Sequence, residues 1–232
     1  MNFLQKPLPP LQRNEKYIGL SYWVIQFALL PSLLGLLAAA FSPEYDATLL
    51  NVVYFSINFV CCVAIFLRLI KASLEKAKAE PEGLLFASAV GFGLYRAASL
   101  VLGIGAMVLF PDFANLNDST LLEILGEHPL LMVVSTVLLA PVAEELLYRG
   151  LIFGWLREKN VYIAYILSAL IFSGIHVVQY IGLYSTAHIV VALVLYLPAG
   201  LSFAWAYQHS GTILAPIIIH AANNLLAFLV LR

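Results

Sequence analysis

Two adjacent carboxylates interrupt an apolar segment in the second half of the chain. The segment LLAPVAEELLYRGLIFGWL carries Glu144, Glu145 and Arg149 among residues that suit a lipid bilayer. On an α-helix, Glu145 and Arg149 stand four residues apart on one face, where they can form an ion pair. Glu144 points about 100° away from Glu145 around the helix axis. We therefore expect one carboxylate to be paired and the other to be free for proton transfer with water.

Histidine and asparagine side chains recur at the same four-residue spacing on two later apolar segments. Phe172 and His176 lie in FSGIH, and His220 and Asn224 lie in HAANN. Counted along predicted helices, Glu144, His176, His220 and Asn224 lie roughly 18, 22, 12 and 18 Å from the same end. Ionisable residues at such depth usually face the protein interior or a water-filled cavity. Three helices are therefore expected to bring these groups to one site.

A packing role is the simplest alternative for each of these residues alone, since polar side chains join transmembrane helices by hydrogen bonds. The complete set, with two carboxylates and an internal arginine, favours a functional site. A structural role is predicted for Arg96, His188 and His209. Arg96 could extend to the membrane surface (snorkel) or pair with an acidic residue, and the two histidines lie near the ends of spans. Pro141 removes a helical hydrogen bond and is predicted to kink or end its helix.

Composition identifies the class of protein. Hydrophobic residues make up 62% of the chain and charged residues 11%, with a mean hydropathy of +0.93. Soluble domains are about half apolar and about a quarter charged. The chain is therefore predicted to be an integral membrane protein. Its net charge of −1 provides no basic field, which argues against a nucleic-acid partner. Cys61 and Cys62 lack a metal or redox spacing and are expected to be apolar fillers.

The apolar segments predict an all-α fold, a polytopic transmembrane helix bundle of about seven spans, within a range of six to eight. Each predicted span is near the 20 residues that cross a bilayer. The spans are 18–41, 47–67, 84–110, 129–156, 161–180, 186–207 and 212–231. Residues 1–17 are predicted to be a cytoplasmic tail, and 18–232 a single membrane domain. The pair Gly91 and Gly93 is expected to mark close helix packing.

Lysine and arginine residues gather on alternate joints between the spans, and cytoplasmic loops carry such an excess. They are Lys6, Arg13 and Lys16, then Arg68, Lys71, Lys76 and Lys78, then Arg157 and Lys159. The other joints carry acidic residues or no charge. The protein is therefore predicted to lie in the cell (plasma) membrane with its N-terminus on the cytoplasmic side. The side of the C-terminus depends on whether 129–156 is a single span.

The three motifs resemble those of a known family. EELLYR, FSGIH and HAANN are similar to the EExxxR, FxxxH and HxxxN motifs of the CAAX prenyl endopeptidase and bacteriocin-processing (CPBP) family of intramembrane proteases. The resemblance covers about residues 125–230. It implies an α-helical membrane protease. Members remove the last three residues from prenylated CAAX proteins, and others are linked to bacteriocin maturation or immunity.

The resemblance also implies a role for each motif residue. Glu144 would be the catalytic carboxylate, and His176 would help to hold the water. His220 and Asn224 would bind the oxyanion. Structural support of the site would come from Glu145, Arg149 and Phe172.

Two other mechanisms use the same residues. Glu144, His176 and His220 would also make a catalytic zinc set. Metal-free catalysis is favoured, because the spacing is not HExxH and an oxyanion role for His220 leaves one histidine for the water. Ser173 lies three residues before His176, but no GxSxG motif supports a serine nucleophile.

The favoured function is an intramembrane endopeptidase that acts on a peptide or lipidated (CAAX-type) protein in the membrane, or on a leader peptide. The alternative is a non-enzymatic membrane protein, either a bacteriocin-immunity-type scaffold or a proton-coupled transporter that uses glutamate and histidine as a relay. Matching broken helices in two halves would indicate a transporter. Here the polar groups crowd the C-terminal half only.

Overall fold

The computed structural model describes residues 7–41, 46–111 and 128–230. Its long elements are helices, which confirms the predicted all-α polytopic bundle. Their bounds are α1 Arg13–Ala28, α2 Leu30–Phe41, α3 Ala47–Ile65, α4 Leu67–Ala79, α5 Pro81–Leu109, α7 Pro129–Val134, α8 Ala140–Glu145, α9 Gly154–Arg157, α10 Val161–Val177, α11 Thr186–Ser210 and α12 Leu214–Val230. Two π-helical segments, η1 Ser135–Leu139 and η2 Leu146–Phe153, and a short 3-10 turn, η3 Val178–Tyr180, complete the described elements.

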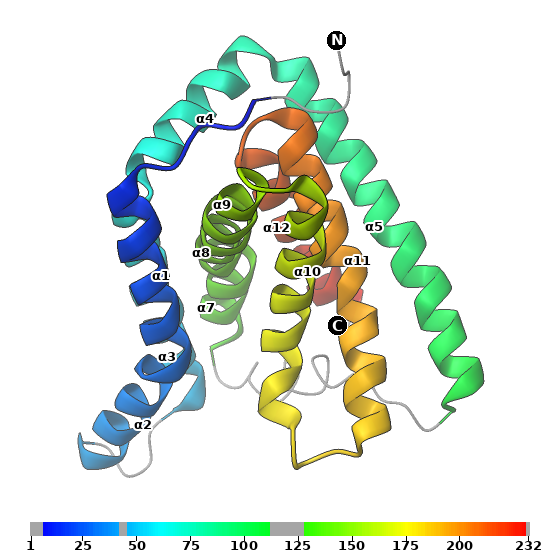
Figure 1. Ribbon diagram of the computed structural model, residues 1–232. Coiled ribbons are helices and arrows are strands. Elements are labelled where there is room, and N and C mark those ends of the chain that lie inside the picture. The colour runs from blue at the N-terminus through cyan, green and yellow to red at the C-terminus, as the bar shows by residue number, and fades with distance from the viewer. Residues whose placement is uncertain (1–6, 42–45, 112–127, 231–232) are drawn as a thin grey trace.

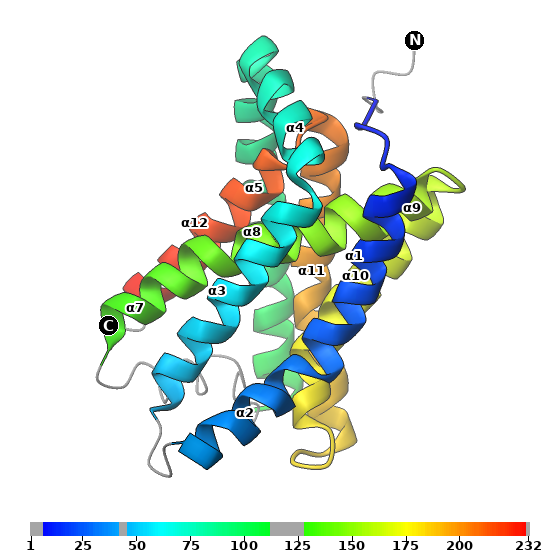
Figure 2. The same ribbon diagram turned by 90° about the vertical axis from the view of Figure 1, so that its left-hand side faces the viewer.

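One continuous helical segment, Pro129–Arg157, runs through the middle of the bundle and comprises α7, η1, α8, η2 and α9. Helices α1 and α3 pack on one side of it, α2 packs against α1 and α3, and α10 and α12 lie on other sides. Helix α11 packs against α10 and α12, and α5 covers α11 and α12 from outside. Helix α4 crosses one end of the bundle (Figure 1), and Figure 2 shows the central segment, from α7 to α9, running behind α3.

Strict criteria of length and hydropathy give five or six described spans, which is close to the predicted number of about seven, with its range of six to eight. Five helices qualify, and a sixth span is made by α1 and α2 together, which bend by 46°. Pro31 lies in the first turn of α2 and cannot donate to the preceding turn, which accounts for the bend. The predicted span 212–231 corresponds to α12, which has 17 residues. The chain is an integral membrane protein.

The sequence predicts that Pro141 kinks or ends its helix. The second of these outcomes is wrong, because the helical segment continues past Pro141. The π-helical segment η1 lies directly before α8, and Pro141 occupies the first turn of α8. In a π-helix each carbonyl accepts from the N–H five residues later, which lets the chain accommodate a missing donor without a break. A second π-helical segment, η2, follows the two glutamates.

Helix boundaries follow from capping residues. The Asp46 side chain accepts from Thr48 N at 2.6 Å, and the Asn160 side chain accepts from the backbone at the start of α10. Pro81 and Pro129 occupy first-turn positions where no N–H donor is needed. Gly211, at φ 74°, ends α11 in the left-handed conformation that glycine adopts without strain. These ends set how far each helix carries its polar residues into the bundle.

Two glycines allow helices to approach closely around the core. A Cβ at Gly200 would lie 2.8 Å from Ala169 Cα, so α11 and α10 touch almost backbone to backbone. A Cβ at Gly91 would lie 2.8 Å from Ile219 Cδ1, which brings α5 against α12. A Cβ at Gly93 would meet nothing within 4 Å. The predicted packing role of this pair therefore applies to Gly91 and not to Gly93.

The part of the central segment that carries the three charged residues is surrounded by protein rather than lipid. All eight residues of η2 are buried, and half of the apolar window in Pro129–Arg157 lies inside the bundle. The other candidate spans are less buried. A helix that is apolar and buried all round belongs to a core. This position explains how a segment with three charged residues can stand at membrane depth.

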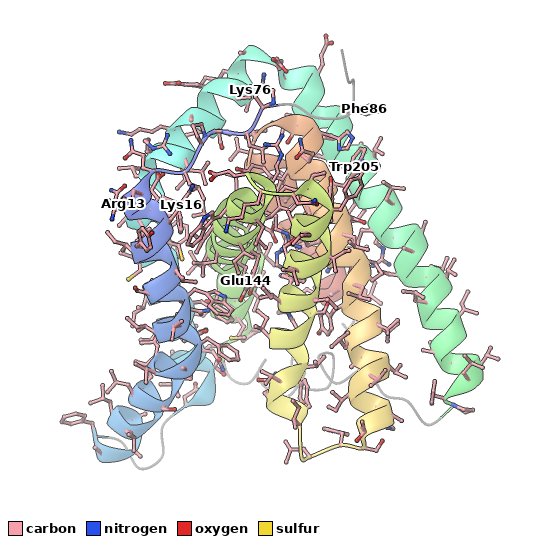
Figure 3. The ribbon with its side chains drawn as sticks, in the orientation of Figure 1. Arg13, Lys16, Lys76, Phe86, Glu144 and Trp205 are labelled. Carbon is pink, nitrogen blue, oxygen red and sulfur yellow. The ribbon has the colours of Figure 1, made fainter. Side chains whose placement is uncertain are left out.

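Most described basic residues lie at one end of the bundle. They are Arg13, Lys16, Arg68, Lys71, Lys76, Lys78, Arg157 and Lys159. Figure 3 shows Arg13, Lys16 and Lys76 at this end, beside α4 and the start of α1. Lys16 pairs with Glu158 at 2.5 Å, so α1 is tied to the residue after α9. Arg96 and Arg149 alone among the described basic residues lie within the helical layer.

Candidate active site

Glu145 joins two helices through a single carboxylate oxygen. Its Oε1 accepts from Arg149 Nη1 at 2.9 Å and lies 2.9 Å from His220 Nδ1. The side chains of Glu145 and Arg149 are 0% exposed, so this ion pair is shielded from both water and lipid. Glu145 therefore fixes the position of α12 relative to the central segment.

Arg149 connects the same segment to α10 and α11. Its Nη2 donates to the carbonyls of Ala199 and Gly200, at 3.1 and 3.3 Å. Its guanidinium carbon lies 4.2 Å from the centre of the Phe172 ring, within the range of a cation–π contact. The close approach of α11 at Gly200 places these carbonyls within reach. Arg149 and Phe172 thus hold three helices around Glu145.

Glu144 points away from this ion pair and toward two histidines. Its Oε2 lies 3.8 Å from His176 Nε2 and 4.0 Å from His220 Nε2. Figure 3 shows Glu144 in the interior of the bundle. Oε2 is buried and makes no hydrogen bond to any part of the chain that the structure describes. These separations are too long for direct hydrogen bonds, and they match a site in which one water bridges the three groups.

The hydrogen bonds behind both histidines define which ring nitrogen faces Glu144. His176 Nδ1 lies 2.8 Å from the Phe172 carbonyl, which only accepts, so this nitrogen carries the hydrogen. His220 Nδ1 donates to the Glu145 carboxylate in the same way. The tautomers are assigned here from these partners. In its neutral form, each histidine therefore presents the lone pair of Nε2 toward Glu144.

Two cavities meet at Glu144 and His176, and each has a volume of about 550 Å³. The first lies between α5, α11 and α12 and also reaches His220, Asn223 and Asn224. The second lies between α1, α2, α3 and α10. A ligand that extends through both would pass the Glu144 carboxylate. The site is thus open on two sides rather than at the end of one pocket.

Asn224 lines the first cavity and is held by the π-helical segment before α8. Its Nδ2 donates to the Thr136 carbonyl at 2.9 Å. A side-chain amide nitrogen has two hydrogens, so one remains to donate to a ligand. The structure thus brings Glu144, His176, His220 and Asn224, which the sequence assigned to three helices, to one cavity.

Four further polar residues were considered in the sequence: Ser173 as a possible nucleophile, and Arg96, His188 and His209 as structural residues. Ser173 is buried and lines neither cavity, so it has no access to a substrate there. His209 stacks on Trp205 with ring centres 4.0 Å apart, and His188 lies beside Ser185 at the start of α11. Arg96 lines the first cavity.

Glu144, His176 and His220 carry the kinds of atoms that bind a zinc ion. Both Nε2 atoms face Glu144, and a carboxylate supports His220 from behind, as in many metal sites. Within residues 7–41, 46–111 and 128–230, however, no group of three or more His, Cys, Asp or Glu residues is arranged to hold a metal ion. The site as folded therefore does not fit the zinc set Glu144, His176 and His220.

Sequence reasoning did not find several contacts that build the site. The bond from His220 to Glu145 joins residues 75 positions apart, and that from Asn224 to Thr136 joins residues 88 apart. His176 also stacks on Tyr196, with ring centres 4.6 Å apart. Four-residue spacing reveals neighbours on one helix, but it contains no signal for such long-range pairs.

The three motifs lie in a part of the chain that matches a known family. Residues 126–226 match the family described as Type II CAAX prenyl endopeptidase Rce1-like. The chain is 27% identical over 228 residues to "Putative membrane peptidase YdiL" of Bacillus subtilis (strain 168), covering 92% of this chain and 87% of the relative. It is 26% identical over 110 residues to "UPF0177 protein YxdF" of Lactococcus lactis subsp. lactis (strain IL1403), covering 47% of this chain and 55% of the relative. No solved structure matches the chain. The resemblance to the CPBP family is confirmed.

The different surroundings of the two glutamates predict different effects on stability. Glu145→Gln leaves Arg149 buried without its counter-charge, and such a loss typically costs about 3 to 5 kcal/mol. Its melting temperature in detergent should therefore fall strongly. Glu144→Gln removes a charge that has no ion-pair partner of fixed charge, so its melting temperature should stay near that of the wild type. Equal effects of the two substitutions would contradict this division.

Proposed function

We propose that the chain, whose residues 126–226 match the family described as Type II CAAX prenyl endopeptidase Rce1-like, is an intramembrane endopeptidase in which Glu144 activates water. The observation that carries the proposal is the position of Glu144 Oε2, 3.8 and 4.0 Å from two histidine nitrogens. A water held there donates one hydrogen to Glu144 and the other to His176. The carboxylate is thus placed to act as a general base.

In the proposed reaction, Glu144 takes a proton from the water while the oxygen attacks the peptide carbonyl carbon. The carbonyl oxygen becomes an oxyanion. The free N–H of Asn224 donates to it, and so does His220 when its Nε2 carries a proton. Glu145, bound at Nδ1, holds the His220 ring so that Nε2 faces the site. One donor of this kind typically contributes about 2.7 to 4 kcal/mol. Collapse of the intermediate breaks the C–N bond, and Glu144 passes its proton to the leaving amine.

The proposed chemistry needs no metal ion, and the arrangement of Glu144, His176 and His220 supports this choice. A zinc-dependent route would need these three side chains to converge on one ion about 2 Å from each. No step in the proposed reaction therefore passes through a metal.

The proposed substrate is a peptide in the membrane, either a lipidated CAAX-type protein or a leader peptide. The second cavity is lined by both apolar and polar residues, and α1, α2 and α3 contribute Phe27, Pro31, Leu34, Leu50 and Phe55 to its apolar part, which suits a segment that arrives from the bilayer. The name of the Bacillus subtilis relative, "Putative membrane peptidase YdiL", agrees with a peptide substrate. A scaffold or a proton-coupled transporter is the rival, and neither would hydrolyse a peptide.

We also propose that the end of the bundle that carries α4 faces the cytoplasm. The eight basic residues at that end support this orientation through the positive-inside rule. In a protein without Cys61 and Cys62, a cysteine at Glu75 should react with a membrane-impermeant thiol reagent only from the cytoplasmic side. A cysteine at Leu183 should react only from the opposite side. The reverse pattern would overturn the orientation.

Glu144→Gln provides the direct test of catalysis. It keeps the size of the side chain and removes the base, so turnover of a peptide library by purified protein should fall by about 10²-fold or more. The same variant should keep the wild-type melting temperature. Cleavage at the wild-type rate by Glu144→Gln would contradict the role of this residue. A wild-type protein that folds and cleaves no peptide would favour the non-enzymatic rival.

The same preparation separates the metal-free and zinc-dependent mechanisms. After treatment with a chelator, the protein should keep its activity with far less than one zinc per chain. Loss of activity with the metal, and recovery on adding zinc back in a 1:1 ratio, would show that the metal-free mechanism is wrong.

A further inference from the structure

The carbonyl of Thr136 lies at a point where the central segment does not supply the usual helical donor. In an α-helix this carbonyl would accept from the N–H four residues later, at Ala140, and in a π-helix from the N–H five residues later, at position 141. The Ala140 N–H bonds to the Ser135 carbonyl instead. Position 141 is a proline, which has no N–H. Neither helical pattern therefore provides a donor for Thr136.

Asn224 of α12 provides a donor in their place. Its Nδ2 lies 2.9 Å from the Thr136 carbonyl oxygen. The hydroxyl of Thr136 does not compete for this bond, because its Oγ1 donates to the Met132 carbonyl at 2.8 Å. A backbone carbonyl at membrane depth needs a partner within the protein. The bond from Asn224 thus meets a requirement of the π-helical segment η1.

This bond also fixes which end of the Asn224 amide faces the carbonyl. A carbonyl only accepts, so Nδ2 and not Oδ1 must face Thr136. At the other end of the amide, Asn223 Nδ2 donates to Asn224 Oδ1 at 3.4 Å. The second hydrogen of Asn224 Nδ2 remains for the first cavity, which Glu144 and His220 also line. An amide turned the other way would present its oxygen, which cannot stabilise an oxyanion.

We propose that Pro141 is a positioning residue for Asn224. Because Pro141 has no N–H, the Thr136 carbonyl stays open to Asn224, and that bond orients the second Nδ2 hydrogen for the oxyanion. The inference rests on the proposed protease function, in which Asn224 donates to the oxyanion. Pro141 is buried and lines neither cavity, so it acts through Thr136 and Asn224 and not by touching the substrate.

The variant Pro141→Ala restores a donor for Thr136 in either helical pattern. If the π-helical pattern is kept, the new N–H at position 141 donates to Thr136. If the segment relaxes to an α-helix, the Ala140 N–H donates to Thr136 instead. In both cases a backbone donor competes with Asn224. Since alanine suits a helical segment better than proline, the melting temperature in detergent should equal or exceed that of the wild type.

Turnover should fall although the protein is no less stable. An interaction made only in the transition state affects kcat, so Pro141→Ala should lower kcat by about 10-fold or more with KM nearly unchanged. Asn224→Ala removes the donor itself and should cost more, about 10²- to 10³-fold. Pro141→Ala should then have no further effect on kcat in the Asn224→Ala background. A wild-type kcat for Pro141→Ala, or the same loss in both backgrounds, would overturn the proposal.

A backbone ester at position 141 separates the missing N–H from the proline ring. Lactic acid incorporated at this position has the side chain of alanine, with an oxygen in place of the N–H. The ester should keep most of the wild-type kcat, whereas Pro141→Ala should not. Equal losses in the two variants would overturn the proposal, because loss of the ring would then explain both.

Pro81→Ala is the matched control. Pro81 also occupies the first turn of a helix, is exposed and lines neither cavity. This control should keep the wild-type kcat. If Pro141→Ala fails to fold because the buried ring is lost, Pro141→Val restores the same N–H with a bulkier side chain, and the same outcomes apply to it.

Melting temperatures test the link between Pro141 and Asn224 without any turnover. Asn224→Ala should lower the melting temperature of the wild type, because Thr136 then loses its donor. The loss should be smaller in the Pro141→Ala background, where a backbone N–H takes over. Equal losses in the two backgrounds would overturn the proposal. Coupled losses without cleavage of any peptide would support the link and contradict the protease function alone.

Discussion

The buried ion pair between Glu145 and Arg149 is the interaction on which the remaining structure depends. Two charges that are 0% exposed are tolerated only when they are paired with each other and supported by further hydrogen bonds. Here the partners are the imidazole of His220, two carbonyls of α11 and the ring of Phe172. These contacts come from α10, α11 and α12. The requirement to satisfy one charge pair therefore determines how three helices pack around the central segment.

The same interaction prepares the chemistry of the neighbouring residue. By accepting from His220 Nδ1, Glu145 directs Nε2 toward Glu144. Because adjacent positions on a helix point in different directions, Glu144 faces the cavities while Glu145 faces the core. Two identical residues next to each other thus have separate tasks. One maintains the packing and orients a histidine, and the other lies beside the Nε2 atoms of two histidines.

Much of this arrangement follows from the sequence, but not all of it. Hydropathy predicts the all-α bundle, and four-residue spacing predicts the Glu145–Arg149 pair. A depth count along three helices predicts that Glu144, His176 and His220 meet. The long-range bonds of His220 and Asn224 have no local signal, because they depend on how tilted helices cross. Pro141 shows a related limit, since the π-helical segment before it depends on the packing that covers it. Arg96 was assigned to snorkelling because its cavity exists only after folding.

A double-mutant cycle on the free energy of unfolding tests the central claim most directly. The claim is that Glu145 stabilises the fold by neutralising the buried charge of Arg149. If so, Arg149→Met should be less harmful in the Glu145→Gln background than in the wild type, and the double variant should be more stable than Glu145→Gln alone. Interaction energies between residues in contact are typically about 0.5 to 3 kcal/mol. Strictly additive effects, with the double variant less stable than either single one, would contradict the account.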